Sequence, residues 1–204
     1  RDSSTSRGLG DVYKRQPYDF YDEQDFYKDV SELELAVNGA YEVLSQKMTY
    51  GHFMLVNDCD TDLSHIKGSG TGHTARDLGH YNIYTSHNWL EEAWGYYYTG
   101  IDRVNRIMAN KERVDLPDEA SQVTFKRLIT EARLLRGICY FDLVRMWGDV
   151  PLKLTASDKT ENFAVTRTNR EEVYQQIVDD MEAAVTDLPW YNAVSYTHLR
   201  AHET

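Results

Sequence analysis

Apolar residues recur at helical spacing in four stretches of the chain, and this pattern predicts an all-α fold. The predicted helices cover approximately residues 31–48, 88–109, 117–147 and 169–188. Each has an apolar stripe three or four residues apart, which is typical of a helix with one buried face. The stripes are Leu33, Val37, Ala40, Tyr41, Leu44 and Met48; Leu90, Trp94, Tyr97, Ile101, Val104 and Met108; Phe125, Leu128, Ala132, Leu135, Cys139, Leu143 and Met146; and Tyr174, Ile177, Met181, Ala184 and Leu188.

Polar residues, prolines and glycines mark where these helices begin and end. Ser31 with Glu34 predicts a capping box for the first helix, and Asn88 and Asn169 are predicted amino-terminal caps of the second and fourth. Pro117 suits the first turn of the third helix, and Gly148 suits its carboxyl-terminal cap.

The third predicted helix carries a second apolar row of Leu134, Ile138 and Phe141, so we expect it to pack on more than one side. Together with the fourth helix it is predicted to form an antiparallel pair of the tetratricopeptide kind, although the strict repeat signature is absent. Two short apolar runs between these helices, residues 150–154 and 163–165, predict a small extended pair.

The long connection of residues 51–87 is rich in glycine and polar residues, and a connection of this length is usually functional or disordered. Four histidines fall in it at irregular spacing, unlike the paired histidines of a helical zinc site, so no metal is predicted. Its glycines lack the following helix and lysine of a phosphate-binding loop. No cofactor is predicted either. The histidines are His65, His73, His80 and His87.

The chain is acidic, with a formal net charge of −11, and it has no cluster of lysine and arginine. This composition argues against binding of nucleic acid or of an anionic membrane through its own surface. Cys59 and Cys139 lie far apart and form no metal-ligand pattern, which favours two free or buried thiols.

Both ends of the chain are interpreted as translated sequencing-adaptor DNA. One strand of a transposase-based adaptor encodes residues 195–204, and the opposite strand encodes residues 6–15. We therefore interpret residues 1–16 and 194–204 as not native and leave them out of the reasoning about fold. The native sequence is expected to be residues 17–193, a fragment open at both ends.

The segment from Glu131 to Leu152 resembles the hallmark of the SusD/RagB family: an E-A-R-x-L-R helix, an aromatic pair, L-x-R-x-W-G and then V-P-L. Two further motifs follow the family's order. One is W-x3-Y-x2-I-x3-N, formed by Trp94, Tyr98, Ile101 and Asn105. The other is R-x3-E-E-V-Y, which starts at Arg167 and continues to Leu188-Pro189. The resemblance covers nearly all of residues 17–193.

This resemblance implies the amino-terminal part of a SusD-like domain, with tetratricopeptide-like helix pairs and long loops. It also implies an outward-facing lipoprotein of the outer membrane in Bacteroidota that acts without catalysis. Such a protein captures a glycan and delivers it to a SusC-like TonB-dependent transporter. The expected partners are therefore a glycan, the transporter and the membrane, reached through a lipid anchor outside this sequence.

We expect the glycan-binding residues in the loop before the second helix, where planar polar and aromatic side chains gather. The charged residues of the hallmark helix, by contrast, are predicted to form ion pairs that lock adjacent helices; these are Arg133, Arg136, Asp142 and Arg145. The predicted glycan-binding residues are Asp60, Asp62, Arg76, His80, Tyr81, Tyr84 and Trp89.

Two other functions remain open from the residues alone. A helical-repeat protein that binds peptides or proteins would retain oligopeptides rather than sugars. An α-helical glycosidase would need two carboxylates at a defined separation and would release reducing sugar. The resemblance favours binding without chemistry, and no catalytic residue is predicted.

Overall fold

The computed structural model describes residues 26–51, 61, 74–80, 83–157 and 165–188. Four long helices dominate: α1 (Val30–Tyr41), α4 (Asn88–Asn110), α5 (Glu119–Trp147) and α6 (Arg170–Asp187). Shorter helical segments are Glu42–Ser45, Lys47–Gly51, α3 (Thr74–Gly79) and Lys111–Arg113. The all-α prediction is confirmed.

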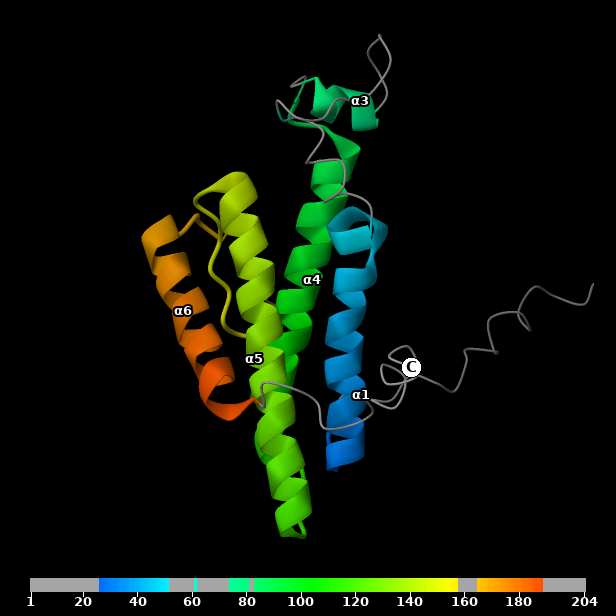
Figure 1. The fold of residues 1–204 in the computed structure, drawn as a ribbon, viewed down its shortest axis with the longest axis vertical. Coiled ribbons are helices and arrows are strands. Elements are labelled where there is room, and N and C mark those ends of the chain that lie inside the picture. Colours follow the sequence, from blue (N-terminus) through cyan, green and yellow to red (C-terminus); the bar gives the residue numbers. More distant parts are fainter. Residues whose placement is uncertain (1–25, 52–60, 62–73, 81–82, 158–164, 189–204) are drawn as a thin grey trace, which may run out of the picture.

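The four long helices run alternately up and down, and α5 packs against each of the other three (Figure 1). The most extensive packing joins α5 to α6, which run antiparallel as the sequence predicted. Within the described residues, no helix has both the length and the apolar composition needed to cross a membrane.

The helix ends partly confirm the predicted caps. Asn169 caps α6 by accepting a hydrogen bond from the Glu171 N–H, and Gly148 ends α5 with a φ of +72°. The capping box at Ser31 is wrong, because Asp29 caps α1 two residues earlier and accepts from the Glu32 N–H at 2.9 Å. Asn88 is the first residue of α4 rather than its cap.

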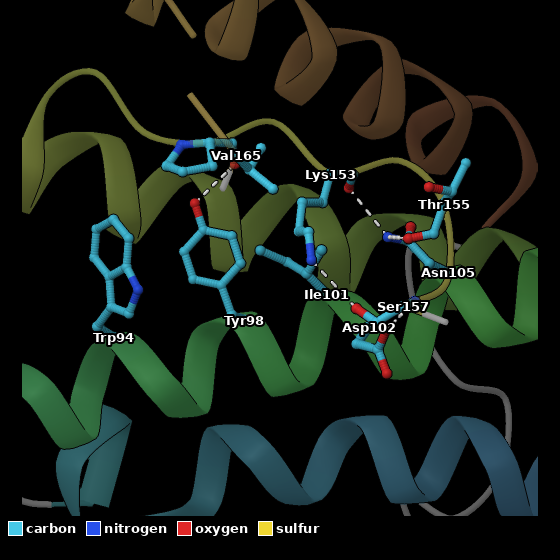
Figure 2. A pocket seen from close by; sticks show the side chains of 10 residues that line it. Trp94, Tyr98, Ile101, Asp102, Asn105, Lys153, Thr155, Ser157 and Val165 are labelled. Atoms are coloured by element: carbon cyan, nitrogen blue, oxygen red, sulfur yellow. Dashed lines mark hydrogen bonds between the residues drawn. The ribbon is translucent and has the colours of Figure 1, made fainter. Parts of the chain in front are cut away.

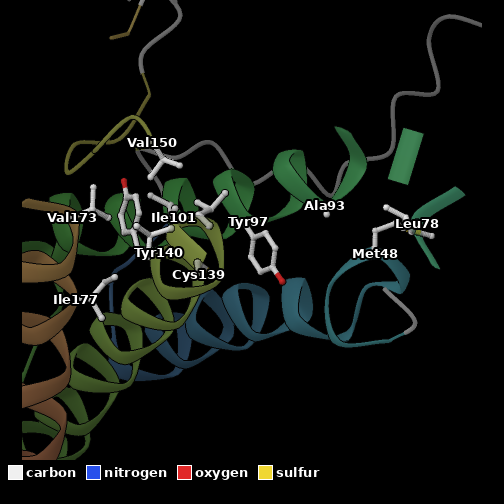
Figure 3. Close-up of a cluster of buried hydrophobic side chains, with 12 residues drawn as sticks. Met48, Leu78, Ala93, Tyr97, Ile101, Cys139, Tyr140, Val150, Val173 and Ile177 are labelled. Carbon is white, nitrogen blue, oxygen red and sulfur yellow. The ribbon is translucent and has the colours of Figure 1, made fainter. Parts of the chain in front are cut away.

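The buried side chains form two clusters along the bundle. One lies between α1, α4 and the first half of α5, and includes Leu33, Val104 and Leu128. The other, shown in Figure 3, joins α4, α5 and α6 around Tyr97, Tyr140 and Ile177. The second cluster also contains Val150, at the start of the segment that leaves α5.

The predicted buried faces of α5 and α6 are partly wrong. On α6, Val173, Ile177, Asp180 and Ala184 are buried, whereas Tyr174 is 40% exposed. On α5, Phe141 of the predicted second row is 38% exposed. The α5 side that faces α6 instead presents polar and small residues, because a buried ion pair occupies this contact; they include Arg136, Gly137 and Tyr140.

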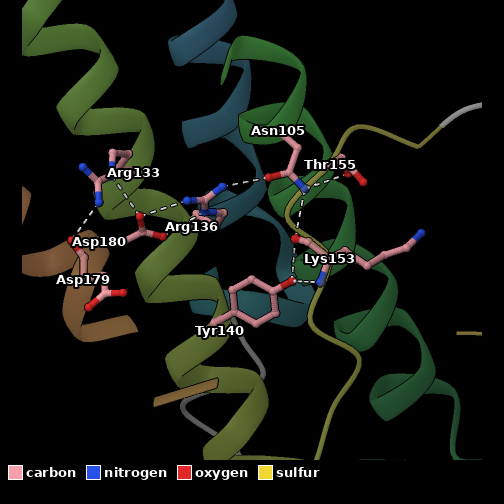
Figure 4. Close-up of polar contacts among 8 residues, drawn as sticks. All are labelled: Asn105, Arg133, Arg136, Tyr140, Lys153, Thr155, Asp179 and Asp180. Carbon is pink, nitrogen blue, oxygen red and sulfur yellow. Dashed lines mark hydrogen bonds and ion pairs between the residues drawn. The ribbon is translucent and has the colours of Figure 1, made fainter. Parts of the chain in front are cut away.

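Arg133 and Arg136 form the predicted interhelical ion pairs (Figure 4). Arg136 donates from Nε to Asp180 Oδ2 at 2.8 Å and from Nη2 to Oδ1 at 2.9 Å, while Arg133 Nε lies 3.0 Å from Oδ1. Asp142 and Arg145 do not link helices: they belong to the same helix and lie 3.7 Å apart.

An extended segment, residues 150–157, returns from the end of α5 along the bundle. Val150 forms an antiparallel bridge with Thr168, just beyond the run 163–165 that was predicted to pair with this segment; residues 163 and 164 of that run lie outside the described residues. Phe163 lies outside the described residues, as does Cys59. Cys139 is a free, buried thiol, and burial raises its pKa to about 12.

Candidate functional site

A pocket of about 310 Å³ lies between α4 and the extended segment 150–157 (Figure 2). From α4 come residues at positions i, i+4, i+7, i+8 and i+11, which share one face of a helix. The segment supplies most of the opposite wall. The lining residues are Trp94, Tyr98, Ile101, Asp102, Asn105, Pro151, Lys153, Thr155, Ser157 and Val165.

Side chains of α4 and α5 hold the backbone of this segment in place. Asn105 Nδ2 donates to the carbonyl oxygens of Lys153 (3.1 Å) and Thr155 (3.0 Å), and the Tyr98 hydroxyl donates to that of Pro151 at 2.7 Å. The Tyr140 hydroxyl donates to Lys153 O at 2.8 Å and accepts from Lys153 N at 2.6 Å. These side chains satisfy backbone groups that a neighbouring strand would satisfy in a sheet.

The orientation of the Asn105 amide follows from a contact on its other side. Arg136 Nη1 donates to Asn105 Oδ1 at 3.0 Å. A guanidinium can only donate, so the amide oxygen must face Arg136 and the NH₂ group must face the segment. Through Arg136, the wall of the pocket is therefore connected to Asp180 on α6 (Figure 4).

One end of the pocket is aromatic. The rings of Trp94 and Tyr98 lie 5.0 Å apart, and Trp147 packs edge-on against Trp94 at 5.3 Å. Trp94 and Tyr98 are both half-buried, so part of each ring remains accessible. Burial raises the pKa of the Tyr98 hydroxyl, which stays a neutral donor.

The other end is charged. Asp102 Oδ1 accepts from the Ser157 N–H at 2.7 Å, and Oδ2 accepts from Arg106 Nε at 2.9 Å. Burial disfavours the ionised carboxyl, but these two partners outweigh it and lower the pKa of Asp102. Lys153 Nζ lies 3.3 Å from Ser157 Oγ. The pocket thus combines apolar ring surface with hydrogen-bonding groups.

The predicted glycan-binding residues that the structure describes do not line this pocket; these are Arg76, His80, Tyr84 and Trp89. Arg76 is half-buried on α3, and His80 is exposed just after that helix. Tyr84 is 40% exposed and contacts the ring of His87 at 5.2 Å.

Trp89 is half-buried against the core at the start of α4, and Lys47 Nζ lies 5.7 Å from the centre of its ring. Asp60, Asp62 and Tyr81 lie outside the described residues, as do His65 and His73. Among the residues that the structure describes, no group of three or more His, Cys, Asp or Glu could hold a metal ion.

The pocket residues were visible in the sequence but were interpreted as a motif, not as a site. Trp94, Tyr98, Ile101 and Asn105 are the four positions of the W-x3-Y-x2-I-x3-N motif, and the V-P-L end of the hallmark leads into the opposite wall. Their common helix face could have been derived from the spacing alone. The facing segment could not, because its position depends on side-chain contacts from two helices.

Several known proteins similar to this chain carry the SusD-like name. A family described as "Starch-binding associating with outer membrane" matches residues 17–202. SusD-like protein P2 of Formosa agariphila is 26% identical over 168 residues, which cover 81% of this chain and 32% of that protein.

Solved structures show the same fold. A SusD homolog from Bacteroides thetaiotaomicron aligns with a TM-score of 0.74 at 27% identity, over 82% of this chain and 32% of that one. A laminarin-binding SusD-like protein aligns with a TM-score of 0.68 at 26% identity, over 80% of this chain and 35% of that one. The chain thus spans about a third of the length of these relatives. With the family match covering most of its residues, the chain belongs to the SusD-like family.

Proposed function

We propose that this chain serves the non-enzymatic capture of an oligo- or polysaccharide at the outer-membrane surface, and its delivery to a SusC-like TonB-dependent transporter. The family match and the laminarin-binding neighbour support the carbohydrate part of this proposal. The observation that carries it on this chain is the pocket between α4 and the segment 150–157.

The pocket has the chemistry that a saccharide requires. A sugar ring presents an apolar face and a rim of hydroxyls, so its binding site needs aromatic surface beside polar groups. Trp94 and Tyr98 supply the aromatic surface, and Asp102, Lys153 and Ser157 supply the polar groups. A volume of about 310 Å³ is at the small end for ligand pockets, which suits a short stretch of a glycan chain.

Binding without hydrolysis agrees with the carboxylates at this site. Glycoside hydrolysis uses two carboxyl groups, one of them with a raised pKa so that it can donate a proton. Among the lining residues that the structure describes, Asp102 is the only carboxylate, and its pKa is lowered. Asp102 is therefore a hydrogen-bond acceptor rather than a proton donor.

The loop before α4 is proposed to extend the binding surface. Tyr84 offers exposed aromatic surface, and Arg76, His80 and Trp89 lie in the same stretch of chain between α3 and the start of α4. Asp60, Asp62 and Tyr81 belong to the same proposal. The lipid anchor and the transporter contact are proposals from the family alone.

Isothermal titration calorimetry with laminarin and with starch oligosaccharides tests the capture proposal. Trp94→Ala should weaken binding roughly tenfold, which corresponds to about 1.4 kcal/mol of lost ring contact. Tyr174→Ala, which removes an exposed aromatic side chain on α6 outside the pocket, should leave binding unchanged. Binding of oligopeptides but of no saccharide would refute the proposal, and so would release of reducing sugar during incubation.

A further inference from the structure

Lys153 and Asp102 are the only lysine, arginine or carboxylate side chains among the ten described residues that line the pocket, and the charged groups around them differ. Asp102 has a cationic partner, since its carboxylate accepts hydrogen bonds from the Arg106 guanidinium and from the Ser157 N–H. Its lowered pKa keeps it ionised, with its charge compensated by Arg106.

Among the residues that the structure describes, the ammonium group of Lys153 has no such compensation. Its polar partner is the neutral Ser157 hydroxyl, at the long distance of 3.3 Å. Within the part of the chain that the structure describes, no carboxylate lies within salt-bridge distance of Nζ. Among the lining residues that the structure describes, Lys153 is the one cationic side chain, in a chain whose net charge is −11.

The backbone that carries this lysine side chain is held in place. The Lys153 backbone is held by three hydrogen bonds, two with the Tyr140 hydroxyl and one with Asn105. The side chain then runs along the pocket toward Ser157 (Figure 2). A charged group attached to a fixed backbone loses less freedom when it binds a ligand, so more of its attraction appears as affinity.

From this charge pattern we infer that the pocket prefers a saccharide that carries an anionic group, either the carboxylate of a uronic acid or a sulfate ester. Lys153 binds the anion, and Trp94 and Tyr98 contact the sugar ring at the other end. Trp94 and Asp102 are eight residues apart on α4, about 12 Å along the helix, which leaves room for both contacts at once. This inference rests on the proposed function.

The preference must act at short range. The strongly negative net charge of the chain repels an anion at a distance, so electrostatic steering does not assist binding. The contact with Lys153 itself must supply the preference, and a substitution at this one position should remove it. Added salt should weaken it only modestly, because the pocket is partly shielded from solvent.

The experiment measures the affinity of the chain for three trisaccharides by calorimetry: neutral laminaritriose, trigalacturonate and a sulfated carrageenan trisaccharide. We expect at least one anionic probe to bind about tenfold more tightly than the neutral one, and the two anionic probes distinguish carboxylate from sulfate. Lys153→Met should abolish this difference, because it lowers the affinity for the anionic probes by more than it lowers the affinity for the neutral one. Lys126→Met, which removes an exposed lysine of α5 outside the pocket, is the matched control.

Three results would overturn the inference. If the neutral probe binds as tightly as both anionic ones, the preference is absent while the proposed capture of saccharides stands. If Lys153→Met lowers the affinity for all probes equally, Lys153 supports the fold of the pocket rather than its selectivity. If no saccharide binds at all, the proposed function fails and the inference fails with it.

Discussion

Two buried carboxylates in the bundle differ sharply in what surrounds them. Asp180 on α6 is 0% exposed and Asp142 on α5 is 1% exposed. Asp180 accepts three hydrogen bonds from the guanidinium groups of Arg133 and Arg136. Asp142 has one distant cation, Arg145 Nη1 at 3.7 Å, whose side chain is 52% exposed.

The surroundings of Asp142 leave polar atoms unsatisfied. Among the described residues, Asp142 Oδ2 and the Tyr97 hydroxyl both lack a hydrogen-bond partner. Burial raises the pKa of Asp142, an effect that the Tyr50 and Tyr97 hydroxyls and Arg145 only reduce. The same burial, with the neighbouring carboxyl, raises the pKa of Tyr97.

The difference shows that burial alone does not determine how a charged residue contributes to the stability of the fold. A buried charge with matched partners is expensive to disrupt, because removing one partner leaves the other charge buried and unpaired. A buried charge without such partners costs free energy as it stands, so its removal can be neutral or stabilising. The two carboxylates should therefore respond to substitution with opposite sign.

Asp180→Ala should have the largest effect, a loss of about 3–5 kcal/mol in the free energy of unfolding. The Arg136 side chain is only 8% exposed, and it would remain charged without its carboxylate. Urea denaturation followed by circular dichroism measures the change. Asp179→Ala, at the adjacent position on the exposed side of α6, should change stability by less than about 0.5 kcal/mol. Equal effects at the two positions would show that the buried ion pair contributes little.

Asn105→Asp tests whether the hydrogen bonds that link Asp180 to Arg136 and Arg136 to Asn105 also support the wall of the pocket. The new carboxylate would still face Arg136, but its other oxygen would point at the Lys153 and Thr155 carbonyls and could not donate to them. We expect a loss of roughly 1–3 kcal/mol, the cost of leaving buried acceptors unsatisfied. Weaker saccharide binding should accompany it, because the pocket wall is no longer held. Unchanged binding would show that the hydrogen bonds between Arg136, Asn105 and the segment are not needed for the pocket to bind a saccharide.

Gly100→Ala addresses the packing around Cys139, which lies one helical turn before Asp142 on α5. A Cβ atom at Gly100 would meet Cys139 Sγ at 3.1 Å and Val43 Cγ1 at 3.2 Å, so the neighbours must shift. The expected loss is about 1–2 kcal/mol, typical of overpacking a core. Gly137→Ala is the control beside Asp180, where the nearest atom, Met181 Cγ, is 3.5 Å away. That substitution should be neutral or stabilise the helix by up to about 1 kcal/mol.

The sequence predicted the parts of this fold that depend on local pattern. The four long helices were predicted because their apolar periodicity extends over many residues, and Gly148 because a positive φ suits glycine. The predicted face of α6 was wrong at Tyr174, because Asp180 belongs to the buried side. Hydrophobic periodicity cannot reveal a carboxylate buried by its arginine partners.

The candidate site was less predictable than the fold. Asn105 and Lys153 meet although they are 48 residues apart in sequence, and their contact depends on an extended segment that, among the described residues, pairs with another extended residue only at Val150. The sequence showed the aromatic residues of α4 as part of a motif. That they line a pocket depends on the position of the extended segment, which the sequence did not predict. The loop residues, Arg76 and Tyr84 among them, remain predictions that the binding experiments address.

Asp142→Asn should give the smallest change, and it should have the opposite sign to Asp180→Ala. Because the pKa of Asp142 is raised in the folded protein, the folded state binds this proton more tightly than the unfolded state. The stability from this group is therefore full below the unfolded pKa of about 3.9 and is lost as pH rises through the folded pKa. Asparagine resembles the protonated form, so the variant should be more stable than the parent at pH 7, by about 1 kcal/mol.

The pH dependence of that difference decides between two causes. If the ionised carboxyl is what costs stability, the advantage of Asp142→Asn should shrink as the pH falls toward about 4, where the parent itself becomes protonated. Asp149→Asn, at an exposed position just after α5, should show no such trend. A variant less stable than the parent at pH 7 would mean that the Tyr50 and Tyr97 hydroxyls stabilise the ionised form more than burial disfavours it. Asp142 would then be held by its neighbours as firmly as Asp180 is.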